Sequence, residues 1–338
     1  MDDALKPQGH HGGGLYFPRV PRIDLLTVGE AFQDLIFVNL PHLPRSGEEL
    51  RTRKFVSTVG GGALITAAAA SRLGLRTAIV SALSDEASRA LRRERVRVLN
   101  LKRRSEPHAI TVSLSTRTDR SFVTFDGINP ELETRLPAAI ARYPARHVHL
   151  AFAPRHCARW TRIVERLRRT GVSTSWDFGW NPALRAAAGF RRLVGAADFV
   201  FVNEAEAVLY ARAKRTSTAL EFWRRASRNT IIKLGPGGSR WISGGQPPVD
   251  MSAAAPRVQV VDTTGAGDAF NGGFLTAWLD GQPPRECLRL GNFVGAQSTR
   301  AAGGVASLPD RPTWPTRPTR PTRPTPPTGP TRPSRSRS

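Results

Sequence analysis

The chain has 338 residues, of which 40% are hydrophobic and 23% are charged, so it is long enough for one large α/β domain with a sizeable core. Its formal net charge at pH 7 is +23, but only five of the 50 basic residues are lysine, and the arginines are spread along the chain without interleaved aromatic residues, which disfavours a specific nucleic-acid partner. The two cysteines are far apart and no stretch approaches the roughly 20 apolar residues of a membrane span, so we expect a cytoplasmic protein without a disulfide framework or a membrane partner.

The N-terminal part begins with a leader and a first buried strand. Residues 1–21 contain paired histidines, three consecutive glycines and several prolines, and they are expected to form a flexible leader. An apolar run predicts a buried strand over Ile23–Glu30, and Asp34 follows it. Residues 35–38 and 49–56 are predicted to be strands of a small sheet.

A glycine-rich turn then opens a helix rich in alanine. Gly60 and Gly61 lie in the turn, and the helix ends at Gly74, a typical C-terminal stop. A strand is predicted at residues 77–82 and a short helix at residues 87–95. Two further short strands, predicted at residues 111–115 and 121–125, pair as a hairpin.

From about residue 145, predicted strands alternate with helical segments. Strands are predicted at residues 147–152, 172–177 and 199–203, and a helix at residues 157–170. This alternation is typical of a mostly parallel sheet with helices on both faces.

Two polar residues mark the end of the strand at 199–203. Asn203 is its last residue, and Glu206 follows three positions later. This spacing at a helix start puts both side chains on one side, where an amide and a carboxylate can order the water ligands of Mg²⁺. The same pair also fits a capping box, in which each side chain accepts a hydrogen bond from the other residue's backbone. The two roles are compatible.

A further strand and glycine-rich turn span residues 230–239, with Lys233 in the strand and Gly235 and Gly237 in the turn. Another strand begins at Trp241. A late helix is predicted over residues 283–302.

The chain is organised around residues 260–273, which read VVDTTGAGDAFNGG. The apolar β-branched residues at 260–261 predict the end of a buried strand, and a helix is predicted over residues 269–279. The turn between them presents backbone N–H groups at a helix N-terminus, which suits a phosphoryl group. These are the N–H groups of Gly265, Ala266 and Gly267.

A carboxylate, Asp268, stands inside this anion-binding turn. Repulsion from a phosphate makes this a poor place for a structural carboxylate, whereas a base that takes a proton from an attacking hydroxyl belongs there. The alternative is an aspartate that only complements the helix dipole.

From residue 309 the composition changes to repeats of Arg, Pro, Thr and Ser. Proline blocks helix and sheet, and no apolar residues remain to form a core. Residues 309–338 are therefore expected to be a disordered basic tail, which leaves residues 22–308 for the folded domain.

The stretch from Asp262 to Phe270, with Gly272 and Gly273 behind it, resembles the second signature of the PfkB (ribokinase-like) carbohydrate kinases. The glycine-rich turn before the alanine-rich helix resembles the first signature of the same family. The resemblance covers about residues 23–308. It implies a ribokinase-like three-layer α/β fold, with a central mostly parallel sheet flanked by helices and a small β lid within residues 35–56 and 111–125.

The resemblance also implies roles for individual residues. Asp268 would be the catalytic base, and the N–H groups of Gly265, Ala266 and Gly267 would stabilise charge on the transferred group. The sugar would be held by Asp34, Gly60 and Gly61. Mg²⁺ would be steadied from Asn203 and Glu206, and the nucleotide ATP would be contacted by Asn203, Lys233, Gly235, Gly237, Thr263 and Asn292. Asp177, Asn181 and Arg185 would lie near the phosphates, and the loop at 302–307 with the Asp262 region would hold a monovalent cation such as K⁺.

The sequence departs from the family pattern at one position of the first signature. Counting back from Gly74, Ile65 occupies the place where the family usually has a sugar-binding asparagine. The departure weakens any assignment to ribose or fructose.

The function implied is transfer of the γ-phosphoryl group of ATP to a primary hydroxyl of a sugar or sugar-like substrate. Two alternatives share the same motifs, namely a nucleoside kinase and a catalytically silent binding or regulatory homologue. A homodimer formed through the lid is a further expectation.

Overall fold

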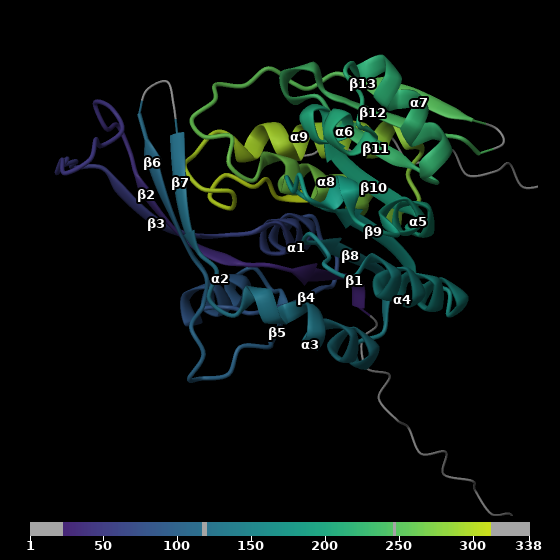
Figure 1. The fold of residues 1–338 in the computed structure, drawn as a ribbon, viewed down its shortest axis with the longest axis horizontal. Coiled ribbons are helices and arrows are strands. Elements are labelled where there is room, and N and C mark those ends of the chain that lie inside the picture. The colour runs from purple at the N-terminus through teal and green to yellow at the C-terminus, as the bar shows by residue number, and fades with distance from the viewer. Residues whose placement is uncertain (1–22, 117–119, 246–247, 312–338) are drawn as a thin grey trace, which may run out of the picture.

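The structure is a computed structural model that describes residues 23–116, 120–245 and 248–311. Within these residues the chain forms two sheets (Figure 1). The leader predicted at 1–21 and nearly all of the tail predicted at 309–338 lie outside the described residues. Residues 309–311 are described, and the guanidinium of Arg311 donates to Asp280 Oδ2 at 2.9 Å.

The main sheet has nine strands in the order β13-β12-β11-β10-β9-β8-β1-β4-β5. All neighbours are parallel except the pairs β11–β12 and β12–β13. The strands are β1 (Ile23–Gly29), β4 (Thr77–Ser81), β5 (Arg97–Asn100), β8 (Ala145–Ala151), β9 (Ser173–Asp177), β10 (Phe199–Asn203), β11 (Thr230–Lys233), β12 (Ser239–Ser243) and β13 (Val249–Ala253).

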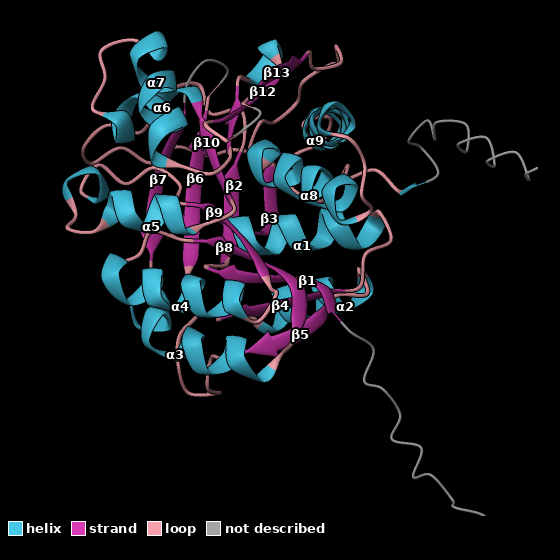
Figure 2. Cartoon of the chain, turned by 90° about the vertical axis from the view of Figure 1, so that its right-hand side faces the viewer, coloured by secondary structure: helices cyan, strands magenta, loops and turns pink. Residues whose placement is uncertain are grey.

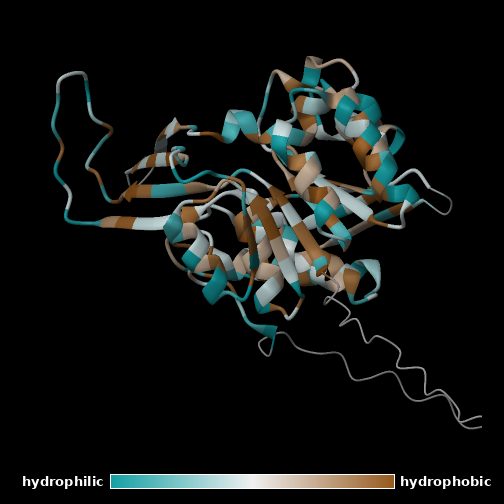
Figure 3. Cartoon of the chain, turned by 90° about the horizontal axis from the view of Figure 1, so that it is seen from below, coloured by the Kyte–Doolittle hydropathy of each residue, from teal (hydrophilic) through white to brown (hydrophobic). Residues whose placement is uncertain are grey.

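Helices cover both faces of this sheet and form a three-layer body (Figure 2). One apolar core lies under α3 (Asn129–Arg142), α4 (Cys157–Arg169), α5 (Phe190–Ala196), α6 (Glu204–Ala211) and α7 (Thr216–Ala226). The other lies under α1 (Gly62–Arg72), α2 (Asp85–Arg93), α8 (Ala266–Leu279) and α9 (Pro284–Ser298). Strand residues alternate between the two cores, and Figure 3 shows hydrophobic residues concentrated in the central strands. The predicted α/β architecture is confirmed.

A second sheet of four strands, which we call the lid, projects from one side of the body (Figures 1 and 3). Its order is β3-β2-β6-β7, with β2 (Phe32–Phe37), β3 (Phe55–Gly60), β6 (Ile110–Ser115) and β7 (Arg120–Phe125). The hairpin predicted at 111–125 is confirmed, because β6 and β7 are antiparallel.

Two predicted strands are wrong in position. The strand expected at 49–56 begins only at Phe55 and continues to Gly60, because residues 57–59 extend the antiparallel pairing with β2. The buried strand expected to end at Val261 does not form: Val260 and Val261 are 56% and 63% exposed. The backbone N–H of Val261 donates to Thr299 O at 2.8 Å, so this segment is hydrogen-bonded to the C-terminal end of α9 instead of joining the sheet.

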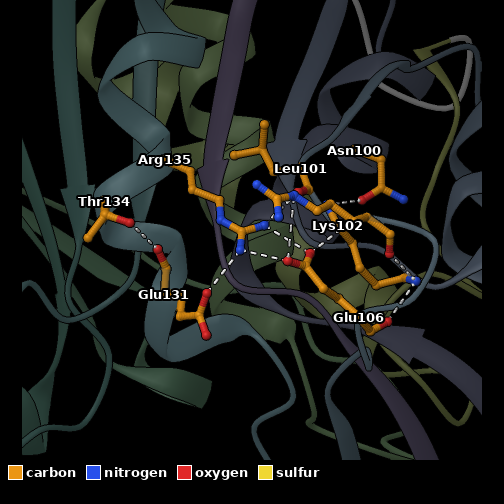
Figure 4. A network of polar contacts seen from close by, with 8 residues as sticks. Asn100, Leu101, Lys102, Glu106, Glu131, Thr134 and Arg135 are labelled. Carbon is orange, nitrogen blue, oxygen red and sulfur yellow. Dashed lines mark hydrogen bonds and ion pairs between the residues drawn. The ribbon is translucent and has the colours of Figure 1, made fainter.

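A polar network holds the segment between β5 and β6 against α3 (Figure 4). Arg135 donates to both carboxylate oxygens of Glu106 at 2.9 and 2.7 Å and to Leu101 O at 3.1 Å. The hydrogen bond from Arg135 lowers the pKa of Glu106 to about 2. The network therefore fixes the base of the lid, since β6 begins directly after this segment.

Two helices meet closely beneath the functional turn. A Cβ placed on Gly272 in α8 would lie 2.6 Å from Ala69 Cβ and 2.9 Å from Thr66 O in α1. The Thr66 hydroxyl also donates to Asp268 O at 3.0 Å. Glycine at 272 thus allows α1 to lie against α8 and to support its first turn.

Candidate active site

The carboxyl ends of the parallel strands meet the N-terminus of α8 at one edge of the main sheet. Asp177 ends β9, Asn203 ends β10 and Lys233 ends β11. Ligands of open α/β sheets bind outside this edge. The position of each polar side chain therefore follows from the strand that precedes it.

Lys233 and Asp177 form a buried ion pair at this edge. Lys233 Nζ lies 2.7 Å from Asp177 Oδ2, and the Asn271 amide donates to the same oxygen at 2.8 Å. Burial alone would raise the pKa of Asp177, but Lys233 and Asn271 outweigh it and lower that pKa. Asp177, which the family resemblance would put near the phosphates, thus holds Lys233 in position.

Asp268 lies in the first turn of α8, close to both α1 and the Lys233 pair. A Cβ on Gly62 would lie 2.9 Å from Asp268 Oδ1, and a Cβ on Gly267 would lie 3.0 Å from Lys233 Nζ. Burial, together with the negative charge of Asp177, raises the pKa of Asp268 to about 7, although Lys233 opposes the shift. A carboxyl with such a pKa can accept a proton near neutral pH.

The turn before Asp268 exposes two backbone donors. Gly265 has φ of 73°, a left-handed conformation that favours glycine. The N–H of Ala266 donates to Thr263 O at 3.2 Å, and that of Asp268 to Gly265 O. Among the residues that the structure describes, no acceptor takes the N–H of Gly265 or Gly267. These two N–H groups are therefore the ones available to an anion.

A cavity of about 610 Å³ opens on Asp268. Gly62, Asp177 and Asp268 are among its lining residues, which include both polar and aromatic side chains. The aromatic lining residues are Phe32, Phe152, Phe178 and Trp180. Its polar lining also includes Glu30, Arg155 and Asn181. A cavity of this volume suits a small organic ligand.

A second cavity, of about 1180 Å³, lies on the other side of Lys233. Asn203, Lys233 and Gly235 line it together with the outer face of α6. Trp180 and Lys233 join the two regions, because Trp180 lines both cavities and Lys233 binds Asp177 of the first.

Asn203 and Glu206 form the predicted capping box at the start of α6. Glu206 N donates to Asn203 Oδ1 at 2.8 Å, and Asn203 N donates to Glu206 Oε2 at 2.8 Å. Burial and the charge of Asp177 raise the pKa of Glu206. The other carboxylate oxygen of Glu206 accepts no hydrogen bond from the described residues.

The predicted sugar-binding residues lie beside the first cavity and not in its lining. Asp34 is in β2, and a Cβ on Gly60 would lie 2.1 Å from its Oδ2. Burial and the charge of Asp262 raise the pKa of Asp34 to about 6. Gly61 has φ of 105° and faces the backbone of Glu30. These residues join the lid to the start of α1.

The remaining predicted nucleotide contacts are spread over three segments. Gly235 and Gly237 form an exposed 3₁₀ turn, and Thr263 lies before the first turn of α8. Asn292 is buried in α9, and its amide donates to Ala253 O at 2.9 Å and Ala254 O at 3.3 Å. Asn292 therefore helps to hold the loop after β13.

Ile65 fills the place of the usual asparagine with an apolar contact. Its side chain is 2% exposed, and its Cδ1 atom lies 2.4 Å from where a Cβ on Gly265 or on Gly304 would stand. This residue therefore supports the anion-binding turn from behind.

Sequence reasoning missed two charged residues of the first cavity, Glu30 and Arg155. Glu30 follows directly on β1, and a charged residue at the carboxyl end of a buried strand is the signal that could have identified it. Arg155 lies in a loop after β8, and nothing in the local sequence separates it from the many other arginines.

Among the described residues, no three histidine, cysteine, aspartate or glutamate side chains gather in a way that could hold a metal ion. Likewise, none of the helices in these parts of the chain has the length and apolarity needed to cross a membrane.

Comparison with known proteins places these features in one family. Residues 22–311 match the family described as pfkB family carbohydrate kinase. A ribokinase of Arabidopsis thaliana is 26% identical over 314 residues, which cover 85% of this chain and 79% of that protein. A nucleoside kinase of Methanothermobacter thermautotrophicus is 28% identical and covers 85% of this chain and 93% of its own length. The solved structure of Arabidopsis thaliana ribokinase complexed with ribose and ATP superposes with a TM-score of 0.69 and 25% identity, covering 86% of this chain and 97% of that one. The chain belongs to the pfkB family of carbohydrate kinases.

Proposed function

We propose that this protein transfers the γ-phosphoryl group of ATP to a primary hydroxyl of a sugar or sugar-like acceptor, with Asp268 as the general base. A carbohydrate kinase of this family uses ATP and a divalent metal. The observation that carries the proposal is the position of Asp268. Its carboxyl group faces a ligand-sized cavity and follows directly on the unpaired N–H groups of Gly265 and Gly267.

The acceptor hydroxyl would lie in the first cavity and lose its proton to Asp268 as its oxygen attacks phosphorus. The N–H groups of Gly265 and Gly267 would stabilise negative charge on the phosphoryl oxygens. Lys233 would add a positive charge on the nucleotide side, held there by Asp177. Asp34, Gly60 and Gly61 would bind the acceptor from the lid side, while Gly235, Gly237 and Thr263 would contact the nucleotide and Asn292 would shape its loop.

Mg²⁺ is the divalent ion that we propose. Asn203 and Glu206 supply oxygen atoms, which this ion prefers, and it usually keeps several of its waters. Mg²⁺ would neutralise charge on the phosphates.

The carboxylate of Asp262 accepts hydrogen bonds from Thr264 and Gly303 and joins the two loops that would hold K⁺.

A homodimer through the lid is the association that we propose for this kinase. Phe55, Phe122, Val123 and Phe125 are each more than half exposed on lid strands, and an exposed apolar patch marks an association surface. Sedimentation of the full chain beside a Phe122→Ser variant tests the dimer, which the variant should weaken.

We expect the reaction to take place in the cytoplasm, where ATP is present.

A nucleoside acceptor is the second candidate. The aromatic wall of the first cavity could stack against a base, and the similarity to a nucleoside kinase supports it. ATP turnover measured against a panel of sugars and nucleosides separates the two candidates.

The Asp268→Asn variant tests the central assignment. It keeps the size of the side chain but cannot accept the proton, so turnover on the best acceptor should fall by a factor on the order of 10²–10⁴. ATP affinity should stay the same or rise slightly, because one negative charge near the phosphates is gone. Wild-type turnover in this variant would show that Asp268 is not the base and only complements the dipole of α8.

A further inference from the structure

Two side chains of opposite charge line the first cavity without forming an ion pair with each other. Glu30 and Arg155 both belong to its lining. The charge of Arg155 lowers the pKa of Glu30 somewhat against the larger effect of burial, so the groups are near enough to interact. Among the described residues, however, neither side chain has a hydrogen-bond or ion-pair partner.

Structural roles do not account for these two groups. The backbone N–H of Arg155 donates to Glu133 Oε2 at 2.9 Å, whereas its side chain is exposed and forms no hydrogen bond or ion pair with the described residues. Glu30 is half-buried, and the charge of Asp126 adds to the raised pKa that burial causes. A half-buried carboxylate without a protein donor costs the fold free energy, and a bound ligand that supplies the donor removes that cost.

The polar groups of this cavity also differ from those that the first signature would supply. Ile65 stands in place of an amide and is packed against Gly265 and Gly304. Glu30 and Arg155 instead provide an acceptor and a donor on the cavity wall. Their charges are opposite and equal, so together they offer hydrogen bonds without a net charge.

We propose that Glu30 and Arg155 select an uncharged polyhydroxylated acceptor, with Glu30 accepting hydrogen bonds from its hydroxyl groups and Arg155 donating to its oxygen atoms. This inference rests on the proposed function of the site. The hydroxyl groups bound here are those that do not react, since the reacting hydroxyl faces Asp268. Trp180, 61% exposed at the edge of the cavity, offers an aromatic face to the apolar side of the acceptor ring.

Charge compensation explains why a neutral acceptor is favoured. An acidic or phosphorylated sugar would pair with Arg155 and bring a like charge toward Glu30, whereas an amino sugar would pair with Glu30 and face Arg155. In each case one member of the pair loses its compensation, and specificity arises from that cost as much as from attraction.

The test uses the full chain and two single variants, Glu30→Gln and Arg155→Gln. Steady-state kinetics with ATP compares the best of the neutral acceptors D-ribose, D-fructose, D-glucose and adenosine with three charged probes that keep a free primary hydroxyl. These probes are D-gluconate, glucose 1-phosphate and D-glucosamine. Titration calorimetry with the same compounds measures recognition independently of turnover.

In the wild type we expect kcat/KM for the best neutral acceptor to exceed that for each charged probe by about tenfold or more. Glu30→Gln should improve D-gluconate and glucose 1-phosphate relative to the neutral acceptor by about tenfold, because the repelling charge is removed. Arg155→Gln should do the same for D-glucosamine. Both variants should raise KM for the neutral acceptor while KM for ATP stays unchanged.

Matched controls remove the same charges away from the cavity. Arg162→Gln and Glu165→Gln, both on α4 and outside the cavity lining, should leave the acceptor preference unchanged. Glu30→Gln should also leave the melting temperature equal or higher, whereas a structural carboxylate would lower it on removal.

Two failures are distinguishable. If no compound turns over although ATP binds, the proposed function is wrong, and the calorimetric preference still decides this inference. If the wild type binds or phosphorylates a charged probe better than every neutral acceptor, or if both variants keep the wild-type preference, the inference is overturned.

Discussion

The Nζ atom of Lys233 lies 2.7 Å from Oδ2 of Asp177, although their strands, β11 and β9, are separated by β10 in the sheet. The side chains are only 13% and 9% exposed. The pair connects the two cavities, because Asp177 lines the first and Lys233 lines the second. Mutation of one or both partners can therefore separate the contribution of the pair to protein stability from its contribution to turnover.

Lys233→Met should destabilise the protein and reduce turnover together. Removing one partner of a buried pair leaves the other charge uncompensated, which costs about 3–5 kcal/mol. The double variant Lys233→Met/Asp177→Asn should recover much of that stability but not the turnover, because the positive charge beside the phosphates is still missing. Chemical denaturation and kinetics on both variants check this, and a double variant with restored turnover would contradict it.

The pH dependence of the rate should report Asp268. Its pKa is raised to about 7, and only the carboxylate form accepts a proton. We therefore expect kcat/KM for the acceptor to fall by about tenfold for each pH unit below about 7 and to level off above it. A flat profile between pH 5 and 8 would show that another group, or none, is the base.

The same pKa predicts a pH-dependent stability difference. Because the folded-state pKa of Asp268 lies above its value in the unfolded chain, the folded wild type loses stability as pH rises toward about 7. Asp268→Asn should therefore be more stable than the wild type at pH 8, with the difference shrinking toward pH 4. Thermal unfolding of both proteins across this range measures it.

Glu206→Gln separates the metal role of α6 from its capping role. Glutamine can still accept the hydrogen bond from Asn203 N, so the helix start should persist. The Mg²⁺ concentration for half-maximal rate should rise, because one negative charge near the ion is lost. An unchanged Mg²⁺ dependence with a lower melting temperature would assign Glu206 to capping alone.

Gly272→Ala tests the packing of α1 on α8. The added Cβ would stand 2.6 Å from Ala69 Cβ, and such overpacking typically costs about 1–3 kcal/mol. Gly245→Ala is the control, since its nearest neighbour would be Ser243 Oγ at 3.9 Å. Denaturation midpoints should fall for the first variant and stay for the second.

The parts of the fold that could be predicted have a local cause. β10 has the predicted bounds of 199–203 because four buried apolar residues precede a capping asparagine. α3 was not predicted, since it contains Pro137 in its interior and begins with an Asn-Pro pair. An Asn-Pro pair is compatible with a helix start, but Pro137 lacks a backbone donor and locally indicates that the helix ends. Only the burial of residues such as Leu132 and Leu136 against the sheet outweighs it.

The candidate site was predictable only where a motif carries it. Asn203 and Lys233 lie at one edge because the parallel strands β10 and β11 end there, whereas Asp268 could be identified from the glycine-rich turn at the start of α8. The pairing of Lys233 with Asp177 depends on tertiary packing across an intervening strand, as does the contact between Ile65 and Gly265. The apolar side chains of Val260 and Val261 suggested a buried strand, but both are more than half exposed and neither residue joins a strand among the described residues.

The start of α1 contacts both the turn that presents the proposed N–H donors and the proposed base, Asp268. Ile65 touches the glycines behind the anion-binding turn, Thr66 bonds to the backbone of Asp268, and Gly62 faces the carboxyl group of Asp268. If Asp268 and the N–H groups of Gly265 and Gly267 act as proposed, a substitution here that changes the acceptor cavity would also displace them. A substitution at the start of α1 would therefore change acceptor preference and maximal rate together. Glu30 and Arg155 lie outside this segment, so substitutions there could change acceptor preference without displacing Asp268.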